Sequence, residues 1–241
     1  MVVDVPTYGR FELESEFLEP YRDTSPPWGF GALSWVTFKR TYSRDGEDWW
    51  ETCRRVIEGM FTVQRVHCLE RRLPWEESKA RAFARKAYDR LFHFKWTPPG
   101  RGLWMMGAEF MYERGGAALN NCGFISTIDI DREFGEPFAW MMHMSMLGVG
   151  VGFDTRGRQK RRLQNPRRDA STHTVGDSRR GWAEALGRLL DAYVGDDTLP
   201  AEWDFSEIRP RGTRLESFGG FASGPAPLRE LLDSLERLYD A

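Results

Sequence analysis

Two stretches of the chain repeat apolar residues at the spacing of an amphipathic helix. After Asp48 these residues are Cys53, Val56, Ile57, Met60 and Phe61, and between Pro74 and Thr97 they are Ala80, Phe83, Ala84, Ala87 and Leu91. Apolar residues three or four positions apart form one stripe on a helix. The pattern predicts two packed helices and indicates that Cys53 is a small buried apolar residue. Residues 1–30, punctuated by proline and glycine, are expected to be extended or irregular.

After Gly102 short strand-like segments alternate with helix-like ones. The predicted strands are Leu103–Met106, Asn121–Ile130, Val149–Phe153 and Trp203–Ile208, and the predicted helices are Phe138–Leu147, Trp182–Val194 and Leu228–Tyr239. This alternation favours an α/β architecture with some parallel pairing. We therefore divide the chain into a mainly helical region, 1–95, and an α/β region, 96–241.

The last predicted helix carries an apolar stripe with no strand after it. The stripe consists of Leu228, Leu231, Leu232, Leu235 and Leu238. A helix of this kind is typical of an interrupted α/β unit, so we expect a partner that covers it.

Composition narrows the class of protein. A hydrophobic content of 41% and an aromatic content of 14% support a real core, and a formal net charge of -2 argues against a dedicated nucleic-acid binder. The 3 cysteines include no Cys-x-x-Cys pair, so neither a disulfide framework nor a zinc site is indicated. No signal peptide and no apolar run of about 20 residues is visible. We expect a cytoplasmic protein without a membrane segment.

Two segments carry candidate chemistry on predicted strands. In Leu119–Phe124, a thiol flanked by asparagines and glycine could be a nucleophile, a metal ligand or a redox donor, or simply a buried cysteine. In Gly148–Asp154, glycines alternate with valines after a predicted helix, which is the wrong order for a dinucleotide fingerprint. The alternation leaves bare backbone on one face, either for close approach of a flat or bulky group or only for packing.

Two further segments are rich in arginine and in glycine. The arginines cluster within residues 156–168. Such a run is usually a solvated loop, and nucleic-acid binding would need a wider basic face, but guanidinium groups also bind a triphosphate in bidentate fashion. Glycine and small residues in 218–224 predict a mobile loop, either a ligand-sensing element or a plain connector.

Seven motifs occur in one order along the chain. They are Trp35–Tyr42, Thr97–Trp104, Leu119–Phe124, Gly148–Phe153, Gly176–Trp182, Glu207–Pro210 and Phe218–Pro225. Together they resemble the monomeric adenosylcobalamin-dependent ribonucleoside-triphosphate reductases. The resemblance extends from about Trp35 to the carboxyl end, and it implies the first half of a ten-stranded α/β barrel preceded by helices and completed by another chain.

The resemblance also implies the chemistry. In such enzymes a thiyl radical, generated with adenosylcobalamin, abstracts the 3′ hydrogen of a ribonucleotide, and two other cysteines then reduce the 2′ position. Asn121-Cys122-Gly123 matches the motif of one reducing cysteine, so Cys122 is expected to be a reducing thiol. The residues expected at the nucleotide substrate are Gly102, Asn121, Gly148, Val149 and Gly150.

Several family features are missing from this sequence. The Asn-Pro-Cys-Gly-Glu-type motif of the radical cysteine, the second reducing cysteine and the Cys-rich tail that accepts electrons from thioredoxin are absent. We expect a second reductase polypeptide that carries the radical cysteine, and a thioredoxin-like dithiol reductant. Either the gene is naturally split or the sequence is a fragment. We favour the natural split, because Leu228–Tyr239 ends cleanly at Asp240-Ala241.

Residues Thr155–Val175 depart from the monomeric family, in which a longer insertion is expected. Dimeric relatives bind their effector at a subunit interface with a loop in this place. The resemblance therefore implies a dNTP or ATP effector, with dimerisation as a further expectation, bound by Asp129, Arg156, Arg158 and Arg161. The loop expected to pass the effector's identity to the substrate base consists of Phe218, Gly219, Gly220, Phe221, Ala222, Ser223 and Gly224. The alternatives are a non-catalytic nucleotide-binding regulatory subunit of half-barrel fold and an arginine-loop nucleic-acid adaptor.

Overall fold

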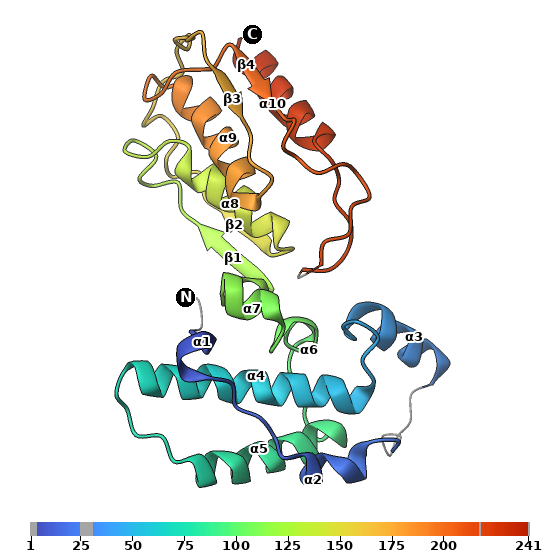
Figure 1. Cartoon of the computed structure of the whole chain (residues 1–241). Helices are drawn as coiled ribbons and strands as arrows, with labels where there is room; N and C mark the ends of the chain where they lie inside the picture. Colours follow the sequence, from blue (N-terminus) through green and yellow to red (C-terminus); the bar gives the residue numbers. More distant parts are fainter. Residues whose placement is uncertain (1–3, 25–30, 217, 241) are drawn as a thin grey trace. The chain divides into compact units, whose positions relative to one another are not determined.

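The computed structural model describes residues 4–24, 31–216 and 218–240. They belong to two compact units, Met1–Asn120 and Asn121–Ala241 (Figure 1). The described part of the first unit is built from helices, and the strands β1 to β4 all lie in the second. The boundary that we predicted at residues 95/96 falls inside the first unit, and that division of the chain stays a prediction.

Two long helices form the centre of the first unit. They are α4 (Trp49–Glu70) and α5 (Glu77–Phe92), and they confirm the two helices that the apolar stripes predicted. Their buried residues include Cys53, Val56 and Ile57 on α4 and Ala80, Ala84, Tyr88 and Leu91 on α5. Met60 and Phe83 were expected in the interior but are exposed. Near Met60 the buried residues of α4 are Gly59 and Thr62, and Phe83 lies at the edge of the buried stripe of α5.

Shorter elements surround these two helices. They are α1 (Val5–Tyr8), α2 (Ser15–Leu18), a 3-10 turn (Glu19–Tyr21), α3 (Ala32–Thr41), α6 (Gly100–Met105), α7 (Glu109–Arg114) and a second 3-10 turn (Gly116–Leu119). The expectation that residues 1–30 are irregular is wrong for α1, α2 and the first turn. Phe11, Leu13 and Leu18 anchor this region in the core of α4 and α5. The other residues of that region up to residue 3 and at 25–30 lie outside the described residues.

The strand predicted at Leu103–Met106 is also wrong, because these residues fall in α6 and its carboxyl cap. A short apolar run has no periodicity that separates a strand from a helix. Here Pro99 is the amino cap, and its carbonyl accepts hydrogen bonds from the backbone N–H groups of Gly102 and Leu103, at 2.7 and 3.2 Å. The turn at Pro99 therefore begins a helix here.

The second unit contains two small parallel sheets. In the first, β1 (Cys122–Ile125) pairs with β2 (Gly150–Phe153), and α8 (Glu136–Met146) connects them. In the second, β3 (Thr172–Thr174) pairs with β4 (Glu202–Asp204), and α9 (Arg179–Ala192) connects them. Parallel pairing with helical crossovers confirms the α/β prediction.

Several boundaries in this unit differ from the prediction. The strands predicted at Asn121–Ile130 and Trp203–Ile208 are shorter, because each chain turns away after its third or fourth paired residue. The strand β3 was not predicted. The last helix is α10 (Ala226–Tyr239), whose Leu228 and Leu232 enter the core with Leu186, Leu189 and Leu199, while Leu231 and Leu238 stay exposed.

No helix of the described residues has the length and apolarity that crossing a membrane requires.

Candidate functional site

The first sheet brings most of the predicted substrate site together. Cys122 is the first residue of β1, and its side chain is exposed, not buried. Its Cα pairs with that of Gly150, whose backbone N–H donates a hydrogen bond of 2.9 Å to the Asn121 carbonyl. Gly148 and Val149 directly precede this pair. The thiol therefore lies beside exposed backbone at the amino end of two parallel strands.

The glycine–valine alternation has the arrangement that the sequence predicted. Val149 is buried, whereas Gly150 and Gly152 are exposed. On the neighbouring strand, a Cβ at Gly123 would lie 3.0 Å from the Trp140 ring, so this glycine admits a tight packing contact. The glycines of β2 instead leave open backbone, where a ligand could approach closely.

Both strands of this sheet remain largely uncovered. Phe124 on β1 is 61% exposed and Phe153 on β2 is 56% exposed. Parallel sheets normally have both faces covered by other elements, since βαβ crossovers place helices on them. Phe124 pairs with Gly152 and Phe153 pairs with Ile125, so the two rings lie on opposite faces of the strand pair, and each leaves an exposed apolar patch suited to further packing.

The carboxyl ends of β1 and β2 are joined by the side chain of Asp154. Its carboxylate accepts hydrogen bonds from the Ser126 hydroxyl at 2.9 Å and from the Thr127 backbone N–H at 3.1 Å. The Arg156 guanidinium also donates to it, at 2.8 Å. Partial burial acts to raise the pKa of Asp154, but these hydrogen bonds outweigh it and hold that pKa well below its usual range. Asp154 is therefore an ionised acceptor shared by donors from three residues.

The arginine-rich segment after β2 folds against the turn that follows β1. Gly157 donates its backbone N–H to the Thr127 hydroxyl at 3.0 Å, and a Cβ at Gly157 would lie 2.1 Å from the Thr127 carbonyl oxygen. Lys160 forms hydrogen bonds with the Ile128 carbonyl and with Asp131. The segment with Arg156 and the turn with Asp129 therefore lie side by side.

The arginines themselves do not converge on one point. Arg156 is bound to Asp154 and Ser126, Arg161 forms an ion pair with Asp196, and Arg168 forms one with Glu236 at 2.9 Å. Among the contacts of the described residues, Arg158 has no side-chain hydrogen bond or ion pair. The effector assignments stay predictions, with Asp129, Arg156 and Arg158 brought close in the fold and Arg161 directed elsewhere.

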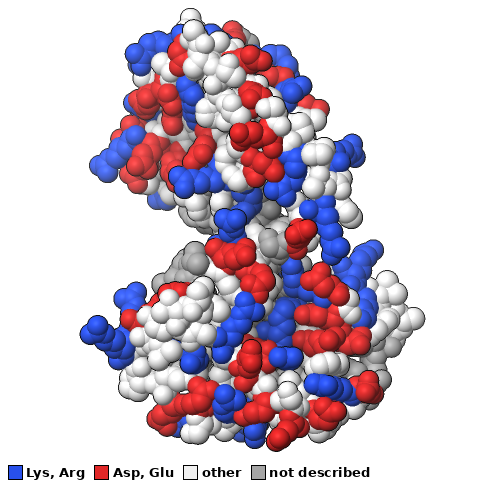
Figure 2. Space-filling model, viewed as in Figure 1, with Lys and Arg blue, Asp and Glu red and all other residues white. Residues whose placement is uncertain are grey.

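Charged side chains of both signs are interspersed over the face drawn in Figure 2, within each unit. A nucleic-acid interface would require a broad basic surface, since its affinity depends mainly on phosphate contacts. The face drawn offers no such surface, and the expectation of no direct nucleic-acid binding stays a prediction.

The glycine-rich loop before α10 folds back on the chain. Gly219, Gly220 and Gly224 have φ angles of 93°, 87° and 74°, a region that favours glycine. Its strand-like return is held by Ala222, whose N–H donates to the Thr213 carbonyl at 2.8 Å and whose carbonyl accepts from Gly212 at 2.9 Å. Phe218, Phe221 and Ser223 belong to the same loop, and Phe221 is exposed. The loop is therefore tied at its base, and its role as a specificity loop stays a prediction.

An open cavity of about 980 Å³ lies along α8 and α9, lined by His143 and His173 among others. Each histidine lies against a guanidinium: His143 contacts Arg179 at 3.2 Å, and His173 contacts Arg188 at 2.9 Å. Burial, followed by the charge of these arginines, lowers the pKa of both histidines. The wall of this cavity therefore favours neutral imidazoles.

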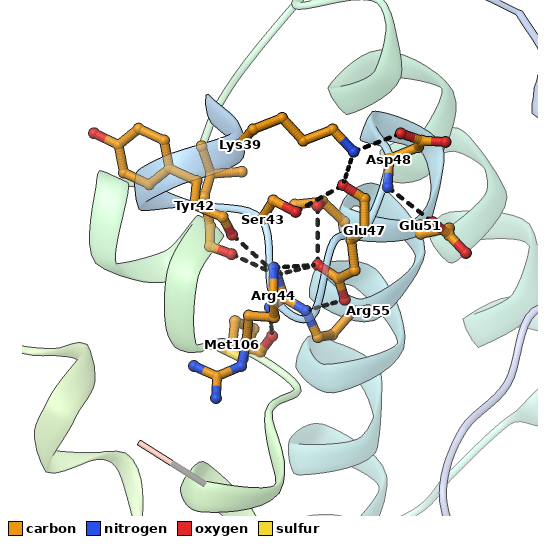
Figure 3. A network of polar contacts seen from close by, with 11 residues as sticks. Lys39, Tyr42, Ser43, Arg44, Glu47, Asp48, Glu51, Arg55 and Met106 are labelled. Carbon is orange, nitrogen blue, oxygen red and sulfur yellow. Dashed lines mark hydrogen bonds and ion pairs between the residues drawn. The ribbon is translucent and has the colours of Figure 1, made fainter. Parts of the chain in front are cut away.

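In the first unit, the segment that carries Gly102 is held by the polar network of Figure 3. The Arg55 guanidinium donates to the carbonyls of Leu103 and Met106, at 2.8 and 2.6 Å. It also forms an ion pair with both carboxylate oxygens of Glu47, at 2.7 and 2.9 Å. A cation at the carboxyl end of a helix satisfies its last carbonyls and opposes the helix dipole. Arg55 therefore fixes the end of α6.

Glycine at two positions lets α4 approach this segment. A Cβ at Gly59 would lie 2.5 Å from the Gly107 Cα, and a Cβ at Gly107 would lie 2.2 Å from the Arg55 carbonyl oxygen. Gly107 also has a φ of 76°. A Cβ at Gly102 would lie 2.8 Å from the Cβ of Pro98. The Thr97–Trp104 motif is thus tightly positioned, and its contact with substrate stays a prediction.

Sequence reasoning missed Asp154, Arg55 and Glu47 as positioning residues. Asp154 had a usable signal, since it directly follows the glycine–valine strand, and polar residues at the carboxyl ends of parallel strands are favoured ligand or loop anchors. The pairing of Arg55 with Glu47 had none, because their eight-residue separation crosses the start of a helix.

Two family models match the chain. The ribonucleotide reductase alpha domain matches residues 13–108, and the insertion domain of B12-dependent ribonucleotide reductase matches residues 152–239. Together they cover most of the chain. The second match includes residues 155–175, so this segment is similar to part of that domain, whereas we had expected a departure from the family there.

Curated relatives agree with these matches. The chain is 40% identical over 243 residues to an adenosylcobalamin-dependent ribonucleoside-triphosphate reductase of Euglena gracilis, covering 97% of this chain and 33% of that protein. A probable enzyme of the same description from Dictyostelium discoideum is 40% identical over 257 residues, with 97% and 34% covered. The alignment with the Lactobacillus acidophilus enzyme, at 29% identity, extends over 302 residues. The chain thus spans about a third of the length of the Euglena and Dictyostelium proteins.

A solved structure is similar as well. The crystal structure of a B-12 dependent (class II) ribonucleotide reductase superposes with a TM-score of 0.78 at 25% identity. The similarity covers 93% of this chain and 39% of that one.

Proposed function

The chain belongs to the adenosylcobalamin-dependent ribonucleotide reductases, and from this premise we propose that it is the amino-terminal part of such an enzyme. It contributes one reducing thiol to the conversion of ribonucleotides to 2′-deoxyribonucleotides. The remaining machinery, including the cysteine that carries the radical, comes from the rest of the reductase as a second polypeptide.

The observation that carries this proposal is the position of Cys122. Its exposed thiol stands at the start of β1 beside the open backbone of Gly150. Cys53, in contrast, is fully buried, and burial raises the pKa of its thiol well above the ordinary value. Of the two, only Cys122 is accessible to a substrate. A regulatory subunit that only binds nucleotides would have no use for this thiol.

The proposed reaction is balanced with one further thiol. The ribonucleotide loses its 2′ hydroxyl as water and gains hydrogen at that carbon, while Cys122 and a second cysteine on the other polypeptide lose two hydrogens and form a disulfide. A hydrogen atom is first removed from the 3′ carbon by the radical cysteine and is returned afterwards. A thioredoxin-like dithiol then reduces the disulfide, so that the enzyme can turn over again.

Adenosylcobalamin supplies the radical when it is bound. The cavity along α8 and α9 is lined by charged groups such as Arg132, Glu136 and Asp191 as well as by Trp140, and this charged lining suits polar contacts better than the broad face of a macrocycle. We therefore assign cofactor binding to the complete reductase and derive no step through the cofactor from this chain.

Completion of the barrel by the second polypeptide is supported by the uncovered sheet. Phe124 and Phe153 remain exposed on a parallel pair that lacks further strands in the described residues. Leu231 and Leu238 of α10 add exposed apolar surface in the same unit. Unpaired strand edges and apolar faces are normally covered by partner elements. We propose that the other half of the reductase barrel covers them, with a dNTP or ATP effector bound near Asp129 and Arg158.

The test is Cys122→Ser in the complete reductase, reconstituted with the polypeptide that carries the radical cysteine. Serine keeps volume and polarity but cannot form a disulfide. The proposal predicts that hydrogen abstraction persists, deoxynucleotide yield per turnover is lost, and free base is released from the substrate. Near-normal deoxynucleotide yield would remove Cys122 from the reaction.

A matched control is Cys68→Ser, which changes the half-exposed cysteine of α4. This variant is expected to keep its yield, with a stability change of about 1 kcal/mol or less, as for most point substitutions. Loss of yield in both variants would indicate a general structural effect and not a role of the Cys122 thiol.

A further inference from the structure

The parallel ladder of β1 and β2 continues past its last backbone pair through a side chain. Ile125 and Phe153 are the final paired residues. Directly after them, Asp154 accepts hydrogen bonds from Ser126 and Thr127, which follow β1. A carboxylate thus replaces the backbone acceptors that a longer strand would offer. The ends of the two strands are tied together where their chains diverge.

The same carboxylate also holds the beginning of the arginine-rich loop. Arg156 donates its backbone N–H to Asp154 at 3.1 Å and its guanidinium Nε at 2.8 Å. The Thr127 hydroxyl, which donates to Asp154 at 3.0 Å, accepts from the Gly157 backbone N–H. One aspartate therefore contacts both the strand that carries Cys122 and the loop that carries Arg156 and Arg158.

Ionisation makes this link a strong one. Hydrogen bonds to a charged acceptor are about twice as strong as those between neutral groups. The side chain of Asp154 is only 18% exposed, so water competes little for its oxygens. Arg156 is 60% exposed by comparison. The carboxylate, and not the guanidinium, is the fixed centre of the contact.

We propose that Asp154 is a positioning residue that couples the arginine-rich loop to the strand carrying Cys122. A nucleoside triphosphate on the loop would attract the Arg156 guanidinium and so change its contact with Asp154. That change reaches β1 through Ser126 and Thr127. The inference rests on the proposed function for its ligand, but the link between loop and strand stands on the contacts alone.

The first arm of the test needs no nucleotide. Hydrogen–deuterium exchange is measured on the chain, on Asp154→Asn and on Asp131→Asn. Asparagine keeps the shape at 154 but cannot accept all five of these donors. We expect amides of β1 and of residues 155–158 to exchange at least about fivefold faster in Asp154→Asn, the lower range of couplings between sites.

Asp131→Asn is the matched control, since Asp131 holds Lys160 of the same loop at 3.3 Å. It should leave the β1 amides unchanged. Amides of α9 should exchange as in the unchanged chain in both variants, which shows that the unit is folded. Acceleration confined to residues 155–158, with β1 unaffected, would overturn the proposal.

The second arm measures the rate of Cys122 alkylation with and without dATP, with inorganic tripolyphosphate as a probe for phosphate alone. We expect dATP to change this rate at least about fivefold in the unchanged chain and in Asp131→Asn. In Asp154→Asn, dATP should still bind but leave the rate unchanged. A persisting change in Asp154→Asn, or binding without any change in the unchanged chain, would refute the coupling.

The two arms separate the inference from the proposed function. If dATP does not bind the unchanged chain, the proposed effector site is wrong. The hydrogen–deuterium exchange measurement alone then decides the role of Asp154. If Asp154→Asn does not fold, Ser126→Ala removes one of the same bonds from the other strand. This variant should accelerate the same two segments to a smaller extent, and acceleration of only one of them would count against the link.

Discussion

The two units are each organised around an ion pair, but the centre of the pair differs. In the first unit Arg55 is the centre: it donates to Glu47 and to the carbonyls at the end of α6, and its side chain is 12% exposed. In the second unit Asp154 is the centre: it directly follows β2 and accepts from Ser126 and Thr127, which follow β1, and from Arg156. A largely buried cation gathers acceptors, whereas a largely buried anion gathers donors.

This difference teaches which partner of each pair is indispensable. Loss of Arg55 would remove a donor from the Leu103 and Met106 carbonyls and the counter-charge from Glu47, whose carboxylate would keep the Arg44 backbone N–H and the Thr52 hydroxyl as donors. Loss of Arg156 would leave Asp154 with Ser126 and Thr127 as donors. Removing the central residue of a network leaves several polar groups with fewer hydrogen-bond partners, whereas removing a peripheral residue affects few.

The largest effect is therefore expected for Arg55→Ala. Removing one partner of a largely buried pair leaves a charge without its counter-charge, so the free energy of unfolding of the first unit should fall by up to about 3–5 kcal/mol. Urea denaturation followed by circular dichroism measures this loss. Arg55→Lys keeps the charge without the planar fork and should recover only part of the stability. A loss below about 1 kcal/mol in Arg55→Ala would show that Arg55 is not the centre of the network.

The next largest loss of unfolding free energy is expected at two glycines that lie close to the backbone of each network. Gly107→Ala places a methyl group against the Arg55 carbonyl at a φ of 76°, and Gly157→Ala places one against the Thr127 carbonyl. Overpacking costs about 1–3 kcal/mol, and a left-handed backbone adds about 1–2. We therefore expect a larger loss of unfolding free energy for Gly107→Ala than for Gly157→Ala.

Two other glycines serve as controls in the same denaturation series. Gly46 has a φ of 85° with nothing near its Cβ position, and Gly176 has neither strain nor neighbours. Gly46→Ala should cost about 1 kcal/mol, and Gly176→Ala should change little. If Gly157→Ala behaves like Gly176→Ala, the close contact between the loop and the turn after β1 is not maintained in solution.

The sequence predicted the elements with long periodicity and missed those decided by contacts far along the chain. The stripes of α4 and α5 and the helices α8, α9 and α10 repeat over three or more turns, so the pattern identified them. In Leu103–Met106, four apolar residues carry no period, and the helix there depends on Arg55, some fifty residues earlier.

The candidate site divides in the same way. Cys122 and the glycines of β2 were identified because they form contiguous motifs, and the parallel pairing placed them together. Asp154 was part of such a motif, but its role depends on Ser126 and Thr127, which are distant in sequence. Contacts between strand ends follow from topology and register, and neither is visible in local composition.

A smaller effect is a difference between the two units in how their stability depends on pH. In the second unit, burial lowers the pKa of His143 and His173, so these histidines bind protons more weakly in the folded state. Their contribution to stability is present above the ordinary histidine pKa near 6.5 and is lost as the pH falls through the folded values. In the first unit burial raises the pKa of Glu58. The contribution of this residue to stability is therefore present at low pH and is lost as the pH rises, the opposite of the histidines.

Acidification from about pH 7.5 to about pH 5.5, across the ordinary histidine pKa, should therefore speed amide exchange in α9, after correction for the intrinsic rate, more than in α4. The double variant His143→Gln/His173→Gln should reduce this pH dependence in α9. An equal pH response of α9 with and without the two histidines would exclude them as its cause.

The smallest change in stability is expected for Arg156→Ala and Arg158→Ala. Arg156 is a peripheral member of the Asp154 network and 60% exposed, and surface ion pairs contribute little. Both variants should therefore unfold at nearly the same urea concentration as the unchanged chain. Their effect should appear in ligand binding instead, since hydrogen bonds from charged groups are each worth about 1.5–3 kcal/mol, or roughly tenfold or more in Kd. Calorimetric titration with dATP measures this loss.

Arg180→Ala, which removes an exposed arginine paired with Glu184 on α9, is the control for general loss of positive charge. If all three variants weaken dATP binding equally, the arginine-rich loop is not the effector site, and long-range attraction accounts for the affinity.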